Sequence, residues 1–179
     1  MLSLGPSLLS GLLDTTSRVV AGGTAFVMFA AATGVQFAVQ RLTRHTILLA
    51  GAVCTTASMA VLVTAVHVSS APALIAAAVL AGAGQGLGQF GGLSLLNSAV
   101  PPRALAEANA ALSVGGYTAA GALSVSAGYL SDALGLTAGA TLFAAALAVL
   151  AVAGGLVVAA VRRADRARPG RLPSQAAPR

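Results

Sequence analysis

Charged side chains are scarce in this sequence. Of the 179 residues, 8% are Asp, Glu, Lys or Arg, and lysine and tryptophan are absent. A soluble domain carries about 25% charged residues, because its surface faces water. Ten basic and four acidic side chains do not cover a globule of this size. The composition therefore excludes a water-soluble fold and indicates an outer surface that faces lipid.

Cysteine is almost absent as well. The single cysteine, Cys54, lies inside an apolar run, which excludes a disulfide or a cysteine-based metal framework. The two histidines, His45 and His67, are expected at opposite membrane faces without a neighbouring carboxylate. We therefore expect no metal and no cofactor. An intramembrane enzyme would need a nucleophile, a base or metal ligands at membrane depth, and since the spans offer none, the protein is not expected to be an enzyme.

The positive charge is confined to particular places. The net charge is +6, and most of the arginines follow residue 161. Aromatic residues do not interleave with these arginines and no recognition module is present, which argues against nucleic-acid binding. A basic segment beside the last apolar run is typical of a membrane protein and contacts anionic lipid. We predict residues 162–179 to be a disordered basic tail on the cytoplasmic side.

Long apolar runs dominate what is present, since 57% of the residues are hydrophobic. About 20 apolar residues form a helix that crosses the hydrocarbon core. Five segments meet this requirement without a charged residue in the middle, and their length favours helices over barrel strands. We predict an all-α, polytopic transmembrane helix bundle over residues 1–161. Its full spans are residues 19–39, 46–66, 72–99, 104–130 and 136–161.

A sixth apolar piece covers residues 2–13 and is interrupted by Gly5 and Pro6. As a helix it would extend about 18 Å at 1.5 Å per residue, less than the roughly 30 Å of a bilayer core. We interpret it as part of a truncated first helix.

The arginines also predict the orientation. If the connections alternate between the two sides, Arg41, Arg44, Arg103 and the tail share one side, and Arg18 lies alone on the other. Basic residues concentrate in cytoplasmic loops. We therefore expect a multi-pass protein of the cell (cytoplasmic) membrane with a cytoplasmic C-terminus. In the loop after residue 99, Glu107 is expected in a first helical turn, where a carboxylate complements the helix dipole.

Glycines concentrate in the span 72–99 and recur in the next one. Small residues spaced by four allow helix backbones to approach closely in a membrane. This spacing occurs within the run of residues 82–92 and again at residues 115–120, which predicts that the two helices cross closely. The packing glycines are Gly82, Gly84, Gly86, Gly88, Gly115 and Gly116.

Polar side chains within the spans have two interpretations. Interhelical hydrogen bonds contribute about 0.6 kcal/mol each, and this role is favoured for any one such residue. A polar wall of a substrate cavity is favoured for Gln85 and Gln89 together, because two amides in one turn exceed what packing requires. The cavity candidates are Gln36, Gln85, Gln89, Asn109, Ser113 and Tyr117. Thr55, Thr56 and Ser58 are expected to bond carbonyls of their own helix.

Residues 84–135, GQGLGQFGGLSLLNSAVPPRALAEANAALSVGGYTAAGALSVSAGYLSDALG, together with five tight helices and a basic loop, resemble the second half of the major facilitator superfamily. The loop from Gln40 to His45 is similar to the basic loop motif of that family, Asp-Arg-x-Gly-Arg-Arg. Gln40 stands in place of the acid and Thr43 in place of the glycine. An Asp–Arg gating pair is therefore not carried over to this loop.

The resemblance implies secondary transport of a small organic solute by alternating access. It implies that spans 19–39, 72–99 and 104–130 face a central cavity and that the other two lie outside them. The expected partners are membrane lipid, the solute, and a missing N-terminal half or a second copy of the chain. The alternative is a structural or assembly membrane protein that does not transport. That protein would not need the two glutamines to face a common cavity.

Overall fold

The computed structural model describes residues 18–166, and every regular element in this part of the chain is a helix. The prediction of an all-helical fold is confirmed for these residues. The predicted piece 2–13 and residues 167–179 lie outside them. The elements are α2 (Arg18–Ala38), α3 (Arg44–His67), α4 (Ala71–Ala99), the short 3-10 helix η1 (Pro102–Ala104), α5 (Leu105–Leu134) and α6 (Leu136–Arg166).

Local sequence signals determine where the helices begin and end. Thr43 and Ser70 precede α3 and α4, and their hydroxyls accept from the amides of Thr46 and Ala73. Side chains of this kind satisfy amides that have no partner within the first helical turn. Pro101 stands just after the end of α4 and prevents that helix from continuing, since proline lacks the amide proton that a helix interior needs. Only Gly135 separates α5 from α6, at a φ of 82° that favours glycine.

Helix α6 continues further than the sequence analysis predicted. The last span was expected to end at residue 161, but α6 includes Arg162, Arg163 and Arg166. The prediction of a disordered tail from residue 162 is therefore wrong for its first five residues. Arginines in a last helical turn interact favourably with the helix dipole, which explains why helical structure persists there.

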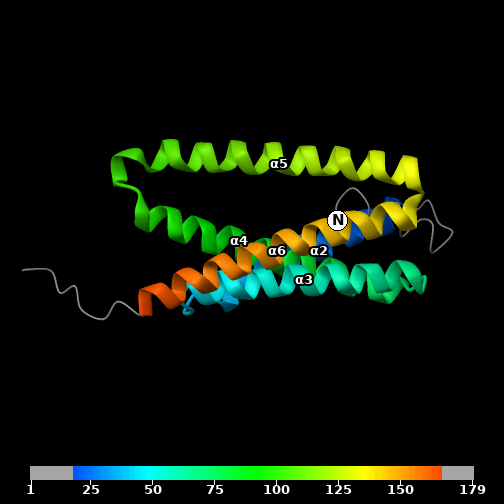
Figure 1. The fold of residues 1–179 in the computed structure, drawn as a ribbon, viewed down its shortest axis with the longest axis horizontal. Coiled ribbons are helices and arrows are strands. Elements are labelled where there is room, and N and C mark those ends of the chain that lie inside the picture. Colours follow the sequence, from blue (N-terminus) through cyan, green and yellow to red (C-terminus); the bar gives the residue numbers. More distant parts are fainter. Residues whose placement is uncertain (1–17, 167–179) are drawn as a thin grey trace, which may run out of the picture.

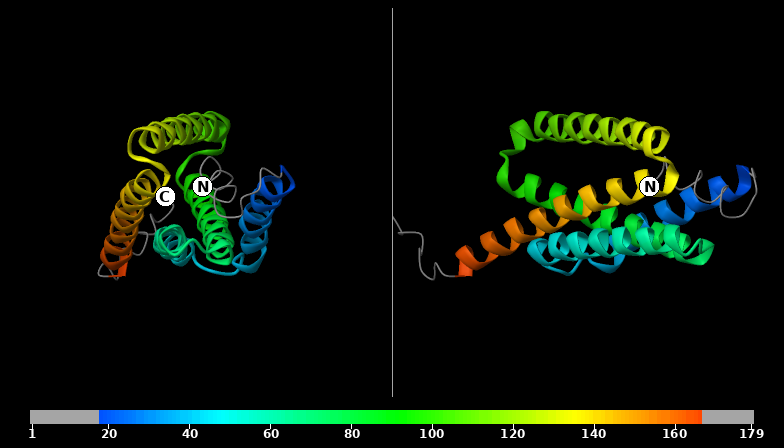
Figure 2. Two further views of the ribbon diagram at one scale, coloured as in Figure 1. Left: turned by 90° about the vertical axis from the view of Figure 1, so that its right-hand side faces the viewer. Right: turned by 45° about the vertical axis from the view of Figure 1, so that its right-hand side comes forward.

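Four helices form a curved layer, and α5 lies on one side of it (Figures 1 and 2). Within the layer α4 packs between α2 and α3, and α6 packs on the far side of α3. Helix α5 contacts mainly α6 and meets α4 only slightly. As a result, Ala127 is its only buried residue.

The apolar core lies where α3, α4, α5 and α6 meet. Leu62 and Leu74 are each 1% exposed, and Phe143 joins them from α6. Ala127 brings α5 into the same cluster. Gly139 of α6 lies so close to Ser131 of α5 that a Cβ there would come within 2.8 Å of the Ser131 backbone. This close approach joins α5 to the layer at one end.

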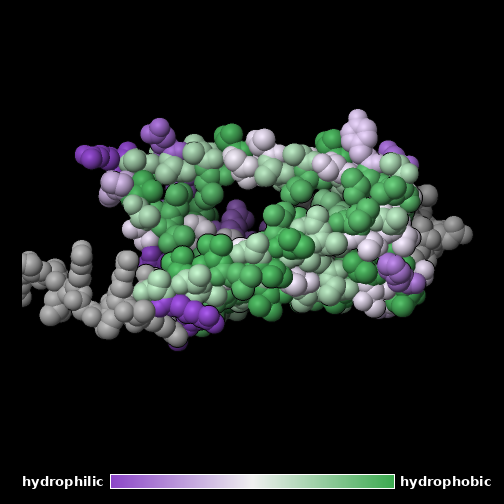
Figure 3. Space-filling model, viewed as in Figure 1, coloured by the Kyte–Doolittle hydropathy of each residue, from purple (hydrophilic) through white to green (hydrophobic). Residues whose placement is uncertain are grey.

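Within residues 18–166, three helices are long and apolar enough to cross a membrane, namely Arg44–His67, Ala71–Ala99 and Leu136–Ala164. The outer surface agrees with this, since large apolar side chains such as Phe26 (73%) and Val53 (68%) are exposed. Figure 3 shows hydrophobic residues over the middle of the molecule and hydrophilic ones mainly at its two ends. These features are compatible with a multi-pass membrane protein. Gly22–Ala38 is a shorter apolar helix, and the prediction of five full spans stays a prediction.

Candidate functional site

Helix α4 is the central helix of the layer, and two of its glycines bring it against α2. A Cβ at Gly82 would collide with the carbonyl group of Met28, and one at Gly86 with the carbonyl group of Ala32. From the first contact to the second, the contacting residue moves four positions forward along α2 and four positions forward along α4. The two helices therefore run parallel at their contact. Because neither glycine has a side chain, the two backbones touch directly, which is the packing typical of membrane helices.

A second set of glycines brings α4 against α3. A Cβ at Gly84 would meet the hydroxyl and the backbone nitrogen of Thr55, and one at Gly91 would come within 2.8 Å of the Leu48 side chain. From the other side, a Cβ at Gly51 would lie 3.2 Å from the backbone nitrogen of Gly88. Helix α4 therefore presents two glycine faces to two different neighbours.

The remaining predicted packing glycines leave room for a side chain. Among the described residues, a Cβ at Gly88, Gly115 or Gly116 would meet no atom of a neighbouring helix within 4 Å, although the backbone of Gly88 lies beside Gly51. The prediction that the helices carrying Gly82 and Gly115 cross closely is wrong, because α5 lies beside the layer and barely touches α4. The spacing of small residues indicates a close approach but does not indicate which helix approaches.

The two glutamines of α4 lie on the part of the helix that its neighbours leave open. At 100° per residue, Gln85 and Gln89 lie roughly 60° from the face that contacts α2 and roughly 130° from the face that contacts α3. Both are exposed. No hydrogen bond of either side chain is found within the described part of the chain. Two amides with several donors and acceptors thus project from the middle of a long apolar helix.

Gln36 of α2 lies at the level of these glutamines. It follows Ala32 by one turn, on the side of α2 that packs on α4, and it is half-buried. Since α2 and α4 run parallel, the turn after the contact between Ala32 and Gly86 brings Gln36 to the level of Gln89. The register of α2 and α4 thus brings Gln36 to about the level of Gln89, and all three glutamines belong to the predicted cavity candidates.

The candidates on α5 lie apart from these glutamines. Tyr117 is 79% exposed, and Ser113 is exposed as well. Asn109 is half-buried, and its Oδ1 is shielded from solvent without a hydrogen-bond partner among the described residues. Figure 3 shows an opening between α5 and the helices below it, with hydrophilic side chains at the back of the opening. The two sets of polar residues thus belong to separate helices that do not pack together.

The predicted basic loop lies at one end of the molecule. Arg44, the first residue of α3, donates to the hydroxyl of Ser98 in the last turn of α4, and that hydroxyl donates to the carbonyl of Leu95. Arg103 is exposed in η1, and Glu107 is exposed in the first turn of α5. No ion pair is formed among the side chains that the structure describes.

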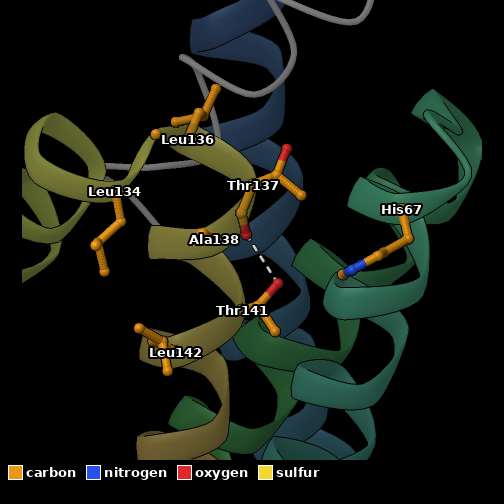
Figure 4. Close-up of a pocket in the computed structure, with 8 residues that line it drawn as sticks. His67, Leu134, Leu136, Thr137, Ala138, Thr141 and Leu142 are labelled. Atoms are coloured by element: carbon orange, nitrogen blue, oxygen red, sulfur yellow. Dashed lines mark hydrogen bonds between the residues drawn. The ribbon is translucent and has the colours of Figure 1, made fainter.

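A depression at the opposite end escaped the sequence analysis (Figure 4). It has a volume of about 730 Å³ and is lined by His67, Thr137, Thr141 and several apolar residues between α3 and the turn from α5 to α6. The Nδ1 atom of His67 donates to the Val63 carbonyl at 2.9 Å, since a carbonyl only accepts. Thr141 donates to the Thr137 carbonyl at 2.8 Å. The site is open and mainly apolar, and no charged side chain lines it.

Metal-ligating residues do not cluster in the part of the chain that the structure describes. Comparison of the chain with protein-family models, with curated proteins and with solved structures found no match. Function therefore has to be argued from the residues and their arrangement.

Proposed function

We propose that this chain is one half of a secondary transporter of the major facilitator type, which moves a small organic solute across the cell membrane by alternating access. The observation that carries the proposal is the pair Gln85 and Gln89. Both side chains are exposed, and neither has a hydrogen bond to another described residue, on a helix that is otherwise long and apolar. The proposal assigns no catalytic role to any residue and requires no cofactor.

The energetics of burial support a cavity beside these glutamines. Placing an amide in an apolar medium without a hydrogen bond costs several kcal/mol. Polar groups at membrane depth accordingly face the bundle interior or a water-filled cavity, and they mark substrate pathways. Gln36 adds a third amide at the same level. A water-filled space along the seam between α2 and α4 would satisfy all three.

Amide side chains recognise a solute through hydrogen bonds rather than through charge. Each primary amide both donates and accepts. The four acidic residues of the chain lie outside the middles of the predicted spans. The solute class that fits this wall carries hydroxyl, carbonyl or amide groups. A second wall is needed opposite the glutamines, and we assign it to another half or to a second copy of the chain.

Orientation follows from the arginines under this proposal. The end that carries Arg41, Arg44 and Arg103 faces the cytoplasm, and the end that carries His67 and Asp132 faces outward. The end of α6 then lies on the cytoplasmic side with the C-terminus.

Thiol accessibility tests the cavity without knowledge of the solute. Cys54 is the only cysteine, so a Cys54→Ala chain provides a clean background. In native membranes, Gln85→Cys and Gln89→Cys are expected to react with a small, charged, water-soluble methanethiosulfonate. Val53→Cys is the matched control, because Val53 is 68% exposed on the apolar surface of α3 and is expected to face lipid.

The two outcomes separate the candidate functions. Reaction at positions 85 and 89, but not at 53, indicates that water reaches the glutamines. Equal failure at all three positions would mean that these amides meet lipid or another helix. That result would favour the structural or assembly membrane protein over the transporter.

A further inference from the structure

Arginines without ion pairs gather at one end of the molecule. The loop between α2 and α3 carries Arg41, the start of α3 carries Arg44, η1 carries Arg103, and the end of α6 carries three more (Figure 1). Those whose side chains the structure describes are Arg41, Arg44, Arg103, Arg162 and Arg163. The only described carboxylate at this end belongs to Glu107. The opposite end carries Asp132, and α2 begins there with Arg18.

The five arginine side chains are neither fully buried nor ion-paired among the described residues. Arg162 is half-buried and the other four are exposed. Only Arg44 has a polar partner within the described residues, the hydroxyl of Ser98. A guanidinium has five N–H donors, so this single bond leaves Arg44 with most of its donors available. Its attachment to Ser98 also ties the loop to the last turn of α4, which places a cationic group at the edge of the apolar surface.

We infer that this arginine end binds the phosphate headgroups of anionic phospholipids at the membrane surface. Guanidinium groups match phosphate oxygens with two parallel hydrogen bonds. Their position beside apolar helices lets one lipid place its headgroup on the arginines and its chains on the exposed apolar side chains. The charge difference between the two ends predicts that binding occurs at this end. The inference requires that the apolar helices lie in a bilayer, but it does not require transport.

Lipid binding is measured with the purified full chain in detergent, so failure of the transport proposal does not affect the result. Phosphatidylglycerol and phosphatidylcholine with identical acyl chains are titrated, and bound lipid is counted by native mass spectrometry. We expect phosphatidylglycerol to bind more tightly and to lose affinity as salt rises, since an arginine near an anionic surface contributes about fivefold in affinity. Equal binding of the two lipids would overturn the inference.

Three variants assign the effect to the arginines. Arg103→Gln together with Arg163→Gln removes two exposed charges that have no hydrogen bond or ion pair among the described residues, so the chain is expected to fold and its preference for phosphatidylglycerol should fall by about 25-fold. Arg103→Lys with Arg163→Lys keeps both charges and should retain most of the preference for phosphatidylglycerol. Asp132→Asn at the opposite end should change nothing. An unchanged preference in the Gln variant would overturn the inference.

Competition with a soluble phosphate tests whether the site requires a lipid. Glycerol phosphate at the same concentration is expected not to displace the lipid, because it lacks the acyl chains that contact the apolar surface. Displacement at equal concentration would identify a site for soluble phosphate and would overturn the assignment to lipid.

Discussion

The carbonyl group of Met28 in α2 occupies the space that a Cβ on Gly82 of α4 would need. Ala32 and Gly86 repeat this relationship one turn further along. These two contacts fix the distance between α2 and α4. They also determine where Gln36 lies relative to the glutamines of α4.

Gly82→Ala or Gly86→Ala should destabilise the bundle by about 2 kcal/mol or more, on the scale of an overpacked core. The added methyl would meet backbone, which cannot move aside as a side chain can. Thermal unfolding in detergent, followed by circular dichroism, measures the loss.

Gly88→Ala and Gly115→Ala are the matched controls, because no atom lies within 4 Å of a Cβ at either position. Alanine favours a helix interior by roughly 0.5–1 kcal/mol over glycine, so these variants should be neutral or more stable. Equal losses at all four positions would contradict the described contact between α2 and α4.

Ser58 provides a second test of the layer. It is fully buried, and its hydroxyl donates at 2.8 Å to the carbonyl of Ala77 in α4. We expect Ser58→Ala to cost about 0.5–1.5 kcal/mol, the usual range for such a bond between membrane helices.

The comparison for Ser58 is Thr64→Ala. Thr64 is exposed and bonds the carbonyl of Ala60 within its own helix, so its loss should change stability by no more than about 0.5 kcal/mol. If the two variants lost the same stability, the Ser58 bond would not hold α3 to α4.

The membrane orientation is testable by labelling from one side. In the Cys54→Ala background, Ser69→Cys and Asp132→Cys should react with an impermeant maleimide added to intact cells, since both positions are exposed at the end that we propose to face outward. Arg103→Cys should react only after the cells are permeabilised. Labelling of position 103 in intact cells would reverse the orientation.

Sequence reasoning identified the helices because apolar length and helix-ending residues are local properties. The predicted start of the second full span at residue 46 and the observed start of α3 at Arg44 differ by two residues, and Pro101 marks the end of α4 within two. The sequence did not, however, indicate which helices pack together. Gly82 and Gly84 lie on different faces of one helix, and the fold alone determines which neighbour each face meets.

The same limit applies to the hydroxyl groups of α3. Thr56 bonds the Ala52 carbonyl of its own helix, as predicted, but Ser58 bonds α4. Both have the same local sequence context, and they differ only in whether a neighbouring carbonyl comes close enough. The glutamine pair was recognisable from sequence because two amides in an apolar run are conspicuous. Its alignment with Gln36 was not, since it depends on the parallel contact of α2 and α4.

The isolated chain is expected not to transport. Helix α5 stands beside the layer with almost all of its surface exposed and contacts α4 only slightly, so it does not cover Gln85 and Gln89, which are exposed. Charged side chains are absent from the middles of α3, α4, α5 and α6, so these helices offer no carboxylate there to carry a proton.

Liposomes containing only this chain should therefore show no more proton flux than empty liposomes, as followed with an enclosed pH-sensitive dye and a protonophore as positive control. Uptake of a panel of radiolabelled sugars and amino acids should likewise stay at the background level. Solute flux that disappears on Gln85→Ala would contradict this expectation and would show that the chain completes its own cavity. Crosslinking between single cysteines placed on α5 would then reveal whether a second copy supplies the opposite wall, because a dimer built on that exposed helix would bring the two cysteines together.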